Sequence, residues 1–181
     1  MRGRAFTCLV ICLLLASVRV VLAAAASEYR VKAVFLFNFS QFVSWPAAAF
    51  DTSNAPVVIA VLGRDPFDGD LDEVIHGEHV GERPLIVRRY REVSDVKDCH
   101  ILFIGRSEAS QLHDIVTALH GRSILTVSDI DDAARNGVMI DLVKESDHIR
   151  LRINVTAARA AGLTLSSKLL RPAQIIGPGD G

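Results

Sequence analysis

The chain has 181 residues, half of them hydrophobic, and its 20 Lys and Arg against 21 Asp and Glu give a formal net charge of −1. This balance argues against a nucleic-acid-binding protein, whose domain would carry a basic excess. Beyond the first 26 residues, no segment is long and apolar enough to span a bilayer. Length and composition therefore predict one globular domain.

The first 26 residues are typical of a secretory signal peptide. Arg2 and Arg4 precede an apolar run over residues 5–18, and the small residues 23–26 offer a cleavage site. We therefore expect export to the periplasm and a mature domain over residues 27–176. Its net charge would be about −4, which again disfavours nucleic acid as a partner.

Cleavage would also leave Cys99 as the only cysteine. In an oxidising compartment such a cysteine is either buried and inert or available for an intermolecular disulfide. An apolar run follows Cys99 directly, which favours the buried alternative. At the C-terminal end of the chain, residues 177–181 are rich in Gly and predict a disordered tail.

The most aromatic stretch of the chain, residues 28–46, predicts a helix. Ser27 fits the N-cap position, and Pro46 ends the helical region. One side of the predicted helix is an apolar stripe that we expect to pack on the core, formed by Val31, Val34, Phe35, Phe39, Phe42 and Val43. Leu36 and Phe37 lie off this stripe. Either another element covers Phe37, or the two residues form an exposed patch for a partner protein.

The remaining chain alternates between short apolar runs and helical patterns. Strands are expected at residues 57–62, 83–90, 100–104, 124–127, 138–143 and 148–153. Helices are expected at residues 66–75, 107–119, 128–135, 154–162 and 163–170. Residues 144–147 carry the best hairpin signal. This order predicts a single α/β domain of three layers, with a mixed, mainly parallel sheet and a C-terminal antiparallel hairpin.

Three patterns were considered as sites of chemistry. Ser107 lies where a hydrolase nucleophile would lie, but Ala109 replaces the required Gly, and the hydroxyl fits a helix cap. His76 and His79 have metal-ligand spacing, although Gly77 between them indicates a solvated loop. The third pattern, Arg150 and Arg152 on one strand, could hold an anion or pair with acids such as Asp141 across the hairpin. We expect no catalysis, no metal and no cofactor.

Several separate segments, in the right order, resemble the YfiR-like periplasmic proteins. They are Tyr29–Phe39 with Phe42 and Trp45-Pro46, Val61–Phe67, Cys99–Ile104, Ile124–Asp129, Ile149–Asn154, Ala157-Ala158, Ala161-Gly162-Leu163 and Ser166–Leu170. The resemblance implies an α/β fold, homodimerisation, and a repressor that binds the periplasmic domain of a YfiN-type inner-membrane diguanylate cyclase. It also implies redox control by disulfides, from which this chain departs because Cys99 would be alone. Asn136-Gly137 stands where the family often has a Gly pair.

Two functions of different classes follow from these observations. The first is a non-enzymatic periplasmic regulator that docks on a membrane cyclase and lowers cyclic di-GMP, through contact residues that we expect to be Leu36, Phe37, Ser166, Ser167, Lys168 and Leu169. The second is a small-ligand sensor acting with a membrane histidine kinase. Its ligand would enter a crevice at the strand ends, lined by Gly63, Asp65, Phe67, Arg106 and Ser107.

Overall fold

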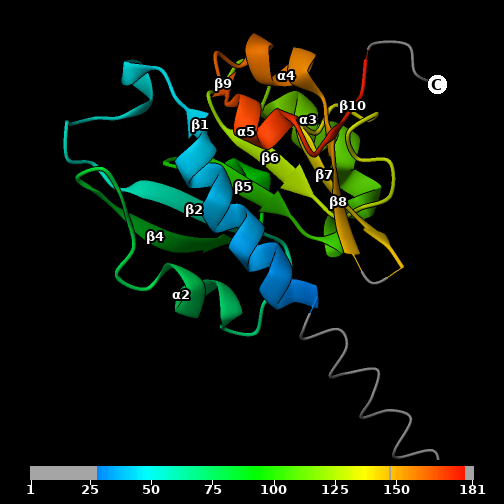
Figure 1. Cartoon of the computed structure of the whole chain (residues 1–181), viewed down its shortest axis with the longest axis horizontal. Helices are drawn as coiled ribbons and strands as arrows, with labels where there is room; N and C mark the ends of the chain where they lie inside the picture. Colours follow the sequence, from blue (N-terminus) through cyan, green and yellow to red (C-terminus); the bar gives the residue numbers. More distant parts are fainter. Residues whose placement is uncertain (1–27, 147, 178–181) are drawn as a thin grey trace, which may run out of the picture.

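The structure is a computed structural model that describes residues 28–146 and 148–177. The expected signal peptide, the Ser27 cap and residues 178–181 of the expected tail lie outside these residues. The long helix, residues 28–42, comes first and is drawn in blue in Figure 1. The helices that follow are η1 (Ala47–Ala49), α2 (Asp70–Ile75), η2 (Val93–Asp95), η3 (Arg106–Gln111), α3 (Leu112–Ala118), α4 (Val155–Ala160) and α5 (Ser167–Leu170).

The strands form one eight-stranded sheet and one small two-stranded sheet. The large sheet has the order β10-β8-β7-β6-β5-β2-β4-β3, and β1 pairs with β9 in the small one. Their bounds are β1 (Val43–Ser44), β2 (Val57–Leu62), β3 (His79–Val80), β4 (Arg83–Tyr90), β5 (Ile101–Ile104), β6 (Leu125–Ser128), β7 (Ile140–Glu145), β8 (His148–Ile153), β9 (Thr164–Leu165) and β10 (Gln174–Ile175).

Parallel pairing dominates the centre of the large sheet. Strands β4, β2, β5, β6 and β7 run parallel to one another, while β7 and β8 pair antiparallel, with Asp141 opposite Arg152. The edge strand β3 is also antiparallel to its neighbour. The mixed, mainly parallel sheet and the C-terminal hairpin are thus confirmed.

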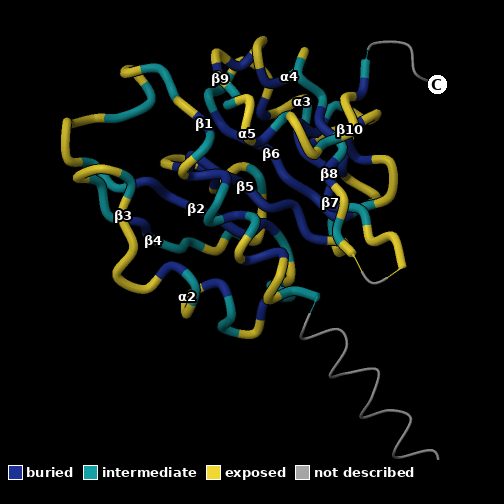
Figure 2. The backbone as a smooth tube through the Cα atoms, viewed as in Figure 1, coloured by how far each residue is buried: buried dark blue, intermediate teal, exposed yellow. Residues whose placement is uncertain are grey.

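Helices cover both faces of the large sheet, which makes three layers (Figure 1). Alternate side chains of each strand point to opposite faces. In β5, Ile101 and Phe103 pack in the cluster that contains the long helix, α2, α4 and α5, whereas Leu102 and Ile104 pack with α3. All residues of β2, β5 and β6 are buried, as the dark central strands of Figure 2 show.

The long helix packs on the sheet through a face that is rotated from the predicted one and that shares Phe39 and Val43 with it. Its buried residues are Lys32, Ala33, Leu36, Phe39, Ser40 and Val43 at its end. This set follows the 3.6-residue period as well as the predicted stripe does, but it is rotated around the helix axis. Val31 and Val34, expected in the core, keep 44% and 43% of their surface exposed. Leu36, expected at a partner surface, is fully buried.

Two of the predicted helices are also wrong. Residues 129–137 form successive turns instead of a helix, and Asp132 adopts a positive φ of 56°. The predicted helix at 163–170 is a two-residue strand, β9, followed by the short helix α5. Thr164 and Leu165 are extended instead of helical because β9 pairs with β1. This pairing also anchors the end of the long helix to the C-terminal part of the domain.

Candidate functional site

A fully buried lysine anchors the long helix to the sheet. The ammonium of Lys32 lies 2.5 Å from Glu28 Oε1, one turn away, and 2.6 Å from Asp129 Oδ2, just beyond the end of β6. Neither Lys32 nor Asp129 exposes any of its side chain. A buried ion requires such partners, because an unpaired charge in a protein interior costs several kcal/mol, on the order of 3–5.

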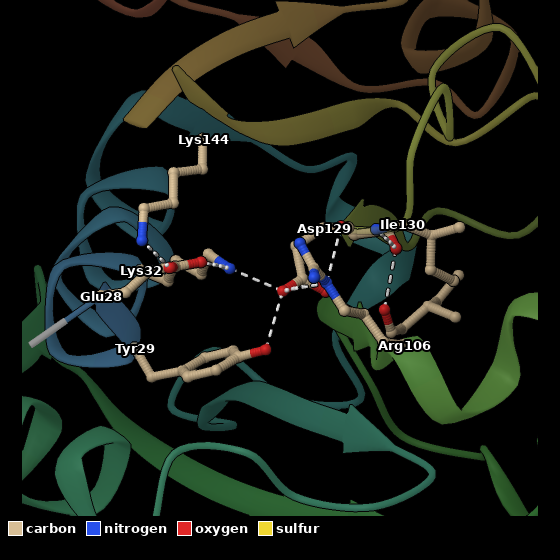
Figure 3. Close-up of polar contacts among 9 residues, drawn as sticks. Glu28, Tyr29, Lys32, Arg106, Asp129, Ile130 and Lys144 are labelled. Carbon is tan, nitrogen blue, oxygen red and sulfur yellow. Dashed lines mark hydrogen bonds and ion pairs between the residues drawn. The ribbon is translucent and has the colours of Figure 1, made fainter. Parts of the chain in front are cut away.

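Asp129 is the centre of this arrangement (Figure 3). Besides Lys32, its Oδ2 accepts a hydrogen bond from the Tyr29 hydroxyl at 3.0 Å and lies 3.3 Å from Arg106 Nε. Arg106 Nε also donates to the Asp129 carbonyl at 3.2 Å. Three residues from two elements therefore meet at a single carboxylate oxygen. The other oxygen, Oδ1, is buried without a partner among the described residues.

A second carboxylate, Glu28, links the long helix to the β7–β8 hairpin. Lys144 Nζ lies 2.8 Å from Glu28 Oε2. Burial opposes ionisation of Glu28, but the hydrogen bonds from Lys144 and Lys32 prevail and lower its pKa. Burial and the neighbouring charge of Asp129 raise the pKa of Tyr29, so its hydroxyl remains a donor at neutral pH. We call Glu28, Tyr29, Lys32, Arg106, Asp129 and Lys144 the charge network.

A cavity of about 360 Å³ adjoins the charge network at the carboxyl ends of β5 and β6. It is lined by Arg106, Asp129, Asp131, Asp132, Asp141, Leu142, Val143, Lys144 and Arg152. Asp141 is almost fully buried, and burial raises its pKa to about 6. One oxygen of Asp141 and the Nε of Arg152 have no hydrogen-bond partner among the described residues. Carboxyl ends of parallel strands are the usual place for a ligand in an open α/β sheet.

The loops after β2 and β5, where the sequence predicts a ligand crevice, contact each other. Ser107 Oγ accepts a hydrogen bond from the Arg64 amide at 2.9 Å, which joins the two loops. Phe67 is fully buried against Tyr29 and Phe103. Asp65 pairs with Arg89 at 2.6 Å.

Of the five predicted crevice residues, only Arg106 lines the cavity, one strand further along the sheet. Gly63 explains why the loops can meet. Its φ is +86°, and a Cβ there would collide with Ser107 and Glu108.

The predicted contact residues for a partner fall into two groups. Leu36 and Leu169 belong to the core, and the expectation that they are exposed is wrong. Phe37 is half-buried and packs against the same core. The exposed residues of α5 are Ser167 and Lys168, while Ser166 caps this helix with its hydroxyl. The only large exposed hydrophobic side chains in the described part of the chain are Val31, Val34 and Ile175.

Sequence reasoning missed the residues that matter most here. Lys32 and Asp129 were read only as part of a family motif, because their contact spans 97 residues of sequence. Asp141 carried a clearer signal, since it is an acid inside the apolar run 138–143. Asp141 lies opposite Arg152 in the hairpin, but the ion pairs of Arg152 are with Asp132 at 3.6 Å and Glu145 at 3.8 Å.

The remaining candidates are Cys99 and the possible metal ligands. The thiol of Cys99 is buried, donates to the Ile101 carbonyl at 3.2 Å, and has its pKa raised by burial to about 12, which supports the inert alternative. Among the described residues, no cluster of His, Cys, Asp or Glu has the arrangement of a metal site. Within the same residues, none of the helices combines the length and apolar character that a membrane crossing requires.

Comparison with known proteins places the chain in a family. Residues 29–174 match the family described as YfiR/HmsC-like, whereas no curated protein matches the chain. The family is periplasmic and implies interaction with a membrane signalling partner. At its coarsest, the match supports a regulator in cyclic di-GMP signalling. Because the match covers nearly the whole described domain, the chain belongs to the YfiR/HmsC-like family.

Proposed function

We propose that the protein is a non-enzymatic periplasmic regulator that binds the periplasmic domain of an inner-membrane diguanylate cyclase and represses it. The family match over residues 29–174 carries this proposal, because a family that serves membrane signalling needs a surface for its partner. Repression of the cyclase would lower cyclic di-GMP in the cell.

The outer face of the long helix is the surface that fits such a partner best. Val31 and Val34 lie one turn apart and expose 44% and 43% of their surface, and the half-buried Phe35 and Phe42 continue the same side. We call these four residues the outer stripe. Apolar side chains held on a rigid helix suit docking, since covering them yields about 25 cal/mol per Å² without new ordering of the backbone. The occupant we infer is the cyclase domain implied by the family.

Cellular cyclic di-GMP tests the repression. Deletion of the gene should raise cyclic di-GMP, and the exported wild-type protein should restore it. Val34→Asp should fail to restore it, because an ionised side chain at the centre of an apolar interface must be desolvated. Ile175→Asp is the matched control, since Ile175 is equally exposed, at 48%, on the different element β10, and it should restore repression. An unchanged level on deletion would contradict the proposal.

Crosslinking from position 34 tests the identity of the partner. A photoreactive residue in place of Val34 should capture a membrane protein with a diguanylate cyclase domain. Capture of a membrane histidine kinase would instead favour the ligand-sensor function. We propose further that the regulator acts as a homodimer. Light scattering of the purified protein should then give twice the chain mass, and a monomer that still represses would contradict this part.

A further inference from the structure

We propose that the cavity of about 360 Å³ beside the charge network binds a small molecule carrying a primary ammonium group with an oxygen acceptor a few bonds away. This ligand class and these lining residues differ from the crevice predicted from the sequence. The volume lies at the lower end of the range for small-molecule sites, which is about 300 to 1,000 Å³. The site does not depend on the proposed docking, because it is assembled by residues of this domain alone.

Unpartnered buried atoms indicate what the ligand must offer. The described part of the chain has three buried side-chain atoms without a hydrogen-bond partner, and all three belong to residues that line this cavity: Asp129 Oδ1, Asp141 Oδ2 and Arg152 Nε. Native proteins satisfy nearly all such atoms. Two carboxylate oxygens call for donors, and one guanidinium N–H calls for an acceptor. An ammonium group with a nearby oxygen provides both.

The charges around the cavity favour the ammonium group. Four acids line it, and the pKa of Asp141 is raised by burial and by the neighbouring charges of Asp132, Asp131 and Asp129, against a lowering effect of Arg152. All three lining cations already have carboxylate partners, because Arg106 contacts Asp129, Lys144 pairs with Glu28, and Arg152 lies 3.6 Å from Asp132. Asp131 and Asp141 have no ion pair among the described residues, so a bound cation would compensate these two carboxylates.

A ligand bound in the cavity would also affect the long helix. Asp129 and Lys144 line the cavity, and they also hold Lys32 and Glu28 of the helix (Figure 3). A ligand that binds Asp129 must compete with or polarise its contacts to Lys32 and Tyr29. Lys32 lies between Val31 and Val34 in the sequence, and Tyr29 lies two residues before Val31. We therefore expect ligand binding to alter the environment of the outer stripe.

An NMR titration of the protein purified from the periplasm tests the site. Ethanolamine, which is protonated at neutral pH and carries a hydroxyl, should cause saturable shifts of the amides near Asp129 and Leu142 and of residues 28–32. Ethylene glycol, which has the same size but no ammonium group, should not. Asp141→Asn should weaken ethanolamine binding at least tenfold while its spectrum stays dispersed, because the variant keeps the shape of the side chain and removes its charge.

Asp98→Asn is the charge-matched control. Asp98 pairs with exposed Arg88 at 3.3 Å and lies outside this cavity, so its variant should bind ethanolamine like the wild type. The proposal is overturned if ethanolamine gives no saturable shifts, if ethylene glycol gives the same ones, or if Asp141→Asn binds normally. Amide shifts confined to residues that line the cavity would overturn the proposed coupling between the cavity and the long helix. No partner protein enters this assay, so its failure is separate from failure of the proposed docking.

Discussion

Lys32 differs from the other lysines of the domain because its ammonium lies inside the fold. Lys32→Met should lower the free energy of unfolding by about 3–5 kcal/mol, since Asp129 would remain buried with only Tyr29 and Arg106 beside it. Urea denaturation measures this loss. Lys97→Met removes an exposed lysine and should change stability by less than about 0.5 kcal/mol. Equal effects of the two substitutions would argue against a structural role for the charge network.

Asp141 gives the domain a pH dependence that can be isolated by substitution. Its pKa is raised from 3.8 to about 6, so the folded state binds the proton more tightly than the unfolded state. Stability from this group is therefore present below about pH 4 and is lost as the pH rises through about 6.

Asp141→Asn removes the effect of ionisation. The stability of the variant relative to the wild type should thus rise between about pH 4 and pH 6, by up to about 3 kcal/mol, and stay level above that range. Urea denaturation at a series of pH values in this range measures the difference. A difference that does not vary with pH would mean that Asp141 titrates normally.

At the scale of elements, the orientation of the long helix can be checked by paired truncations. Leu36→Ala should cost about 2–5 kcal/mol, because the side chain is fully buried and its loss leaves a cavity. Val34→Ala should cost less than about 0.5 kcal/mol, since Val34 faces outward. Thermal or chemical denaturation compares the two variants. A larger loss of stability for Val34→Ala than for Leu36→Ala would mean that the helix buries the face predicted from the sequence.

The strands were predictable and the helix face was not, for physical reasons. The bounds of β2, β4 and β8 were predicted to the residue. A continuous apolar run marked the fully buried β2, whereas apolar residues that alternate with Arg150 and Arg152 marked the partly exposed β8. The helix carries two overlapping apolar stripes, and the buried one includes Lys32 and Ser40. Lys32 can be buried only because Asp129 lies beside it, and no local pattern reveals that carboxylate.

The candidate site was partly predictable for a related reason. The rule that ligands bind at the carboxyl ends of strands led to the correct edge of the sheet and to Arg106. It did not show whether the cavity lies between the loops after β2 and β5 or beyond the end of β6. Ser107 joins the loops after β2 and β5 through the Arg64 amide, whereas the cavity lies beyond β6, beside the turns at 131–137 and the β7–β8 hairpin.

For the whole molecule, the topology predicts a gradient of local stability. The amides of β2 and β5 should exchange with solvent most slowly, because both strands are buried and have neighbours on each side. Those of β3 and β10 should exchange faster, since these are two-residue strands at the edges of the sheet. Hydrogen exchange followed by NMR measures the order. Fast exchange in β2 would mean that the sheet does not form one cooperative unit.

The charge network also affects the order in which the parts of the domain fold. The long helix is synthesised before the rest of the domain, yet its contacts with Asp129 and Lys144 join residues 97 and 116 positions apart. Such distant contacts close late in folding. Until the hairpin has emerged, Lys32 has Glu28 alone as a carboxylate neighbour, and the apolar residues on both sides of the helix stay uncovered. The part of the described domain that is synthesised first is therefore the last to reach its final place.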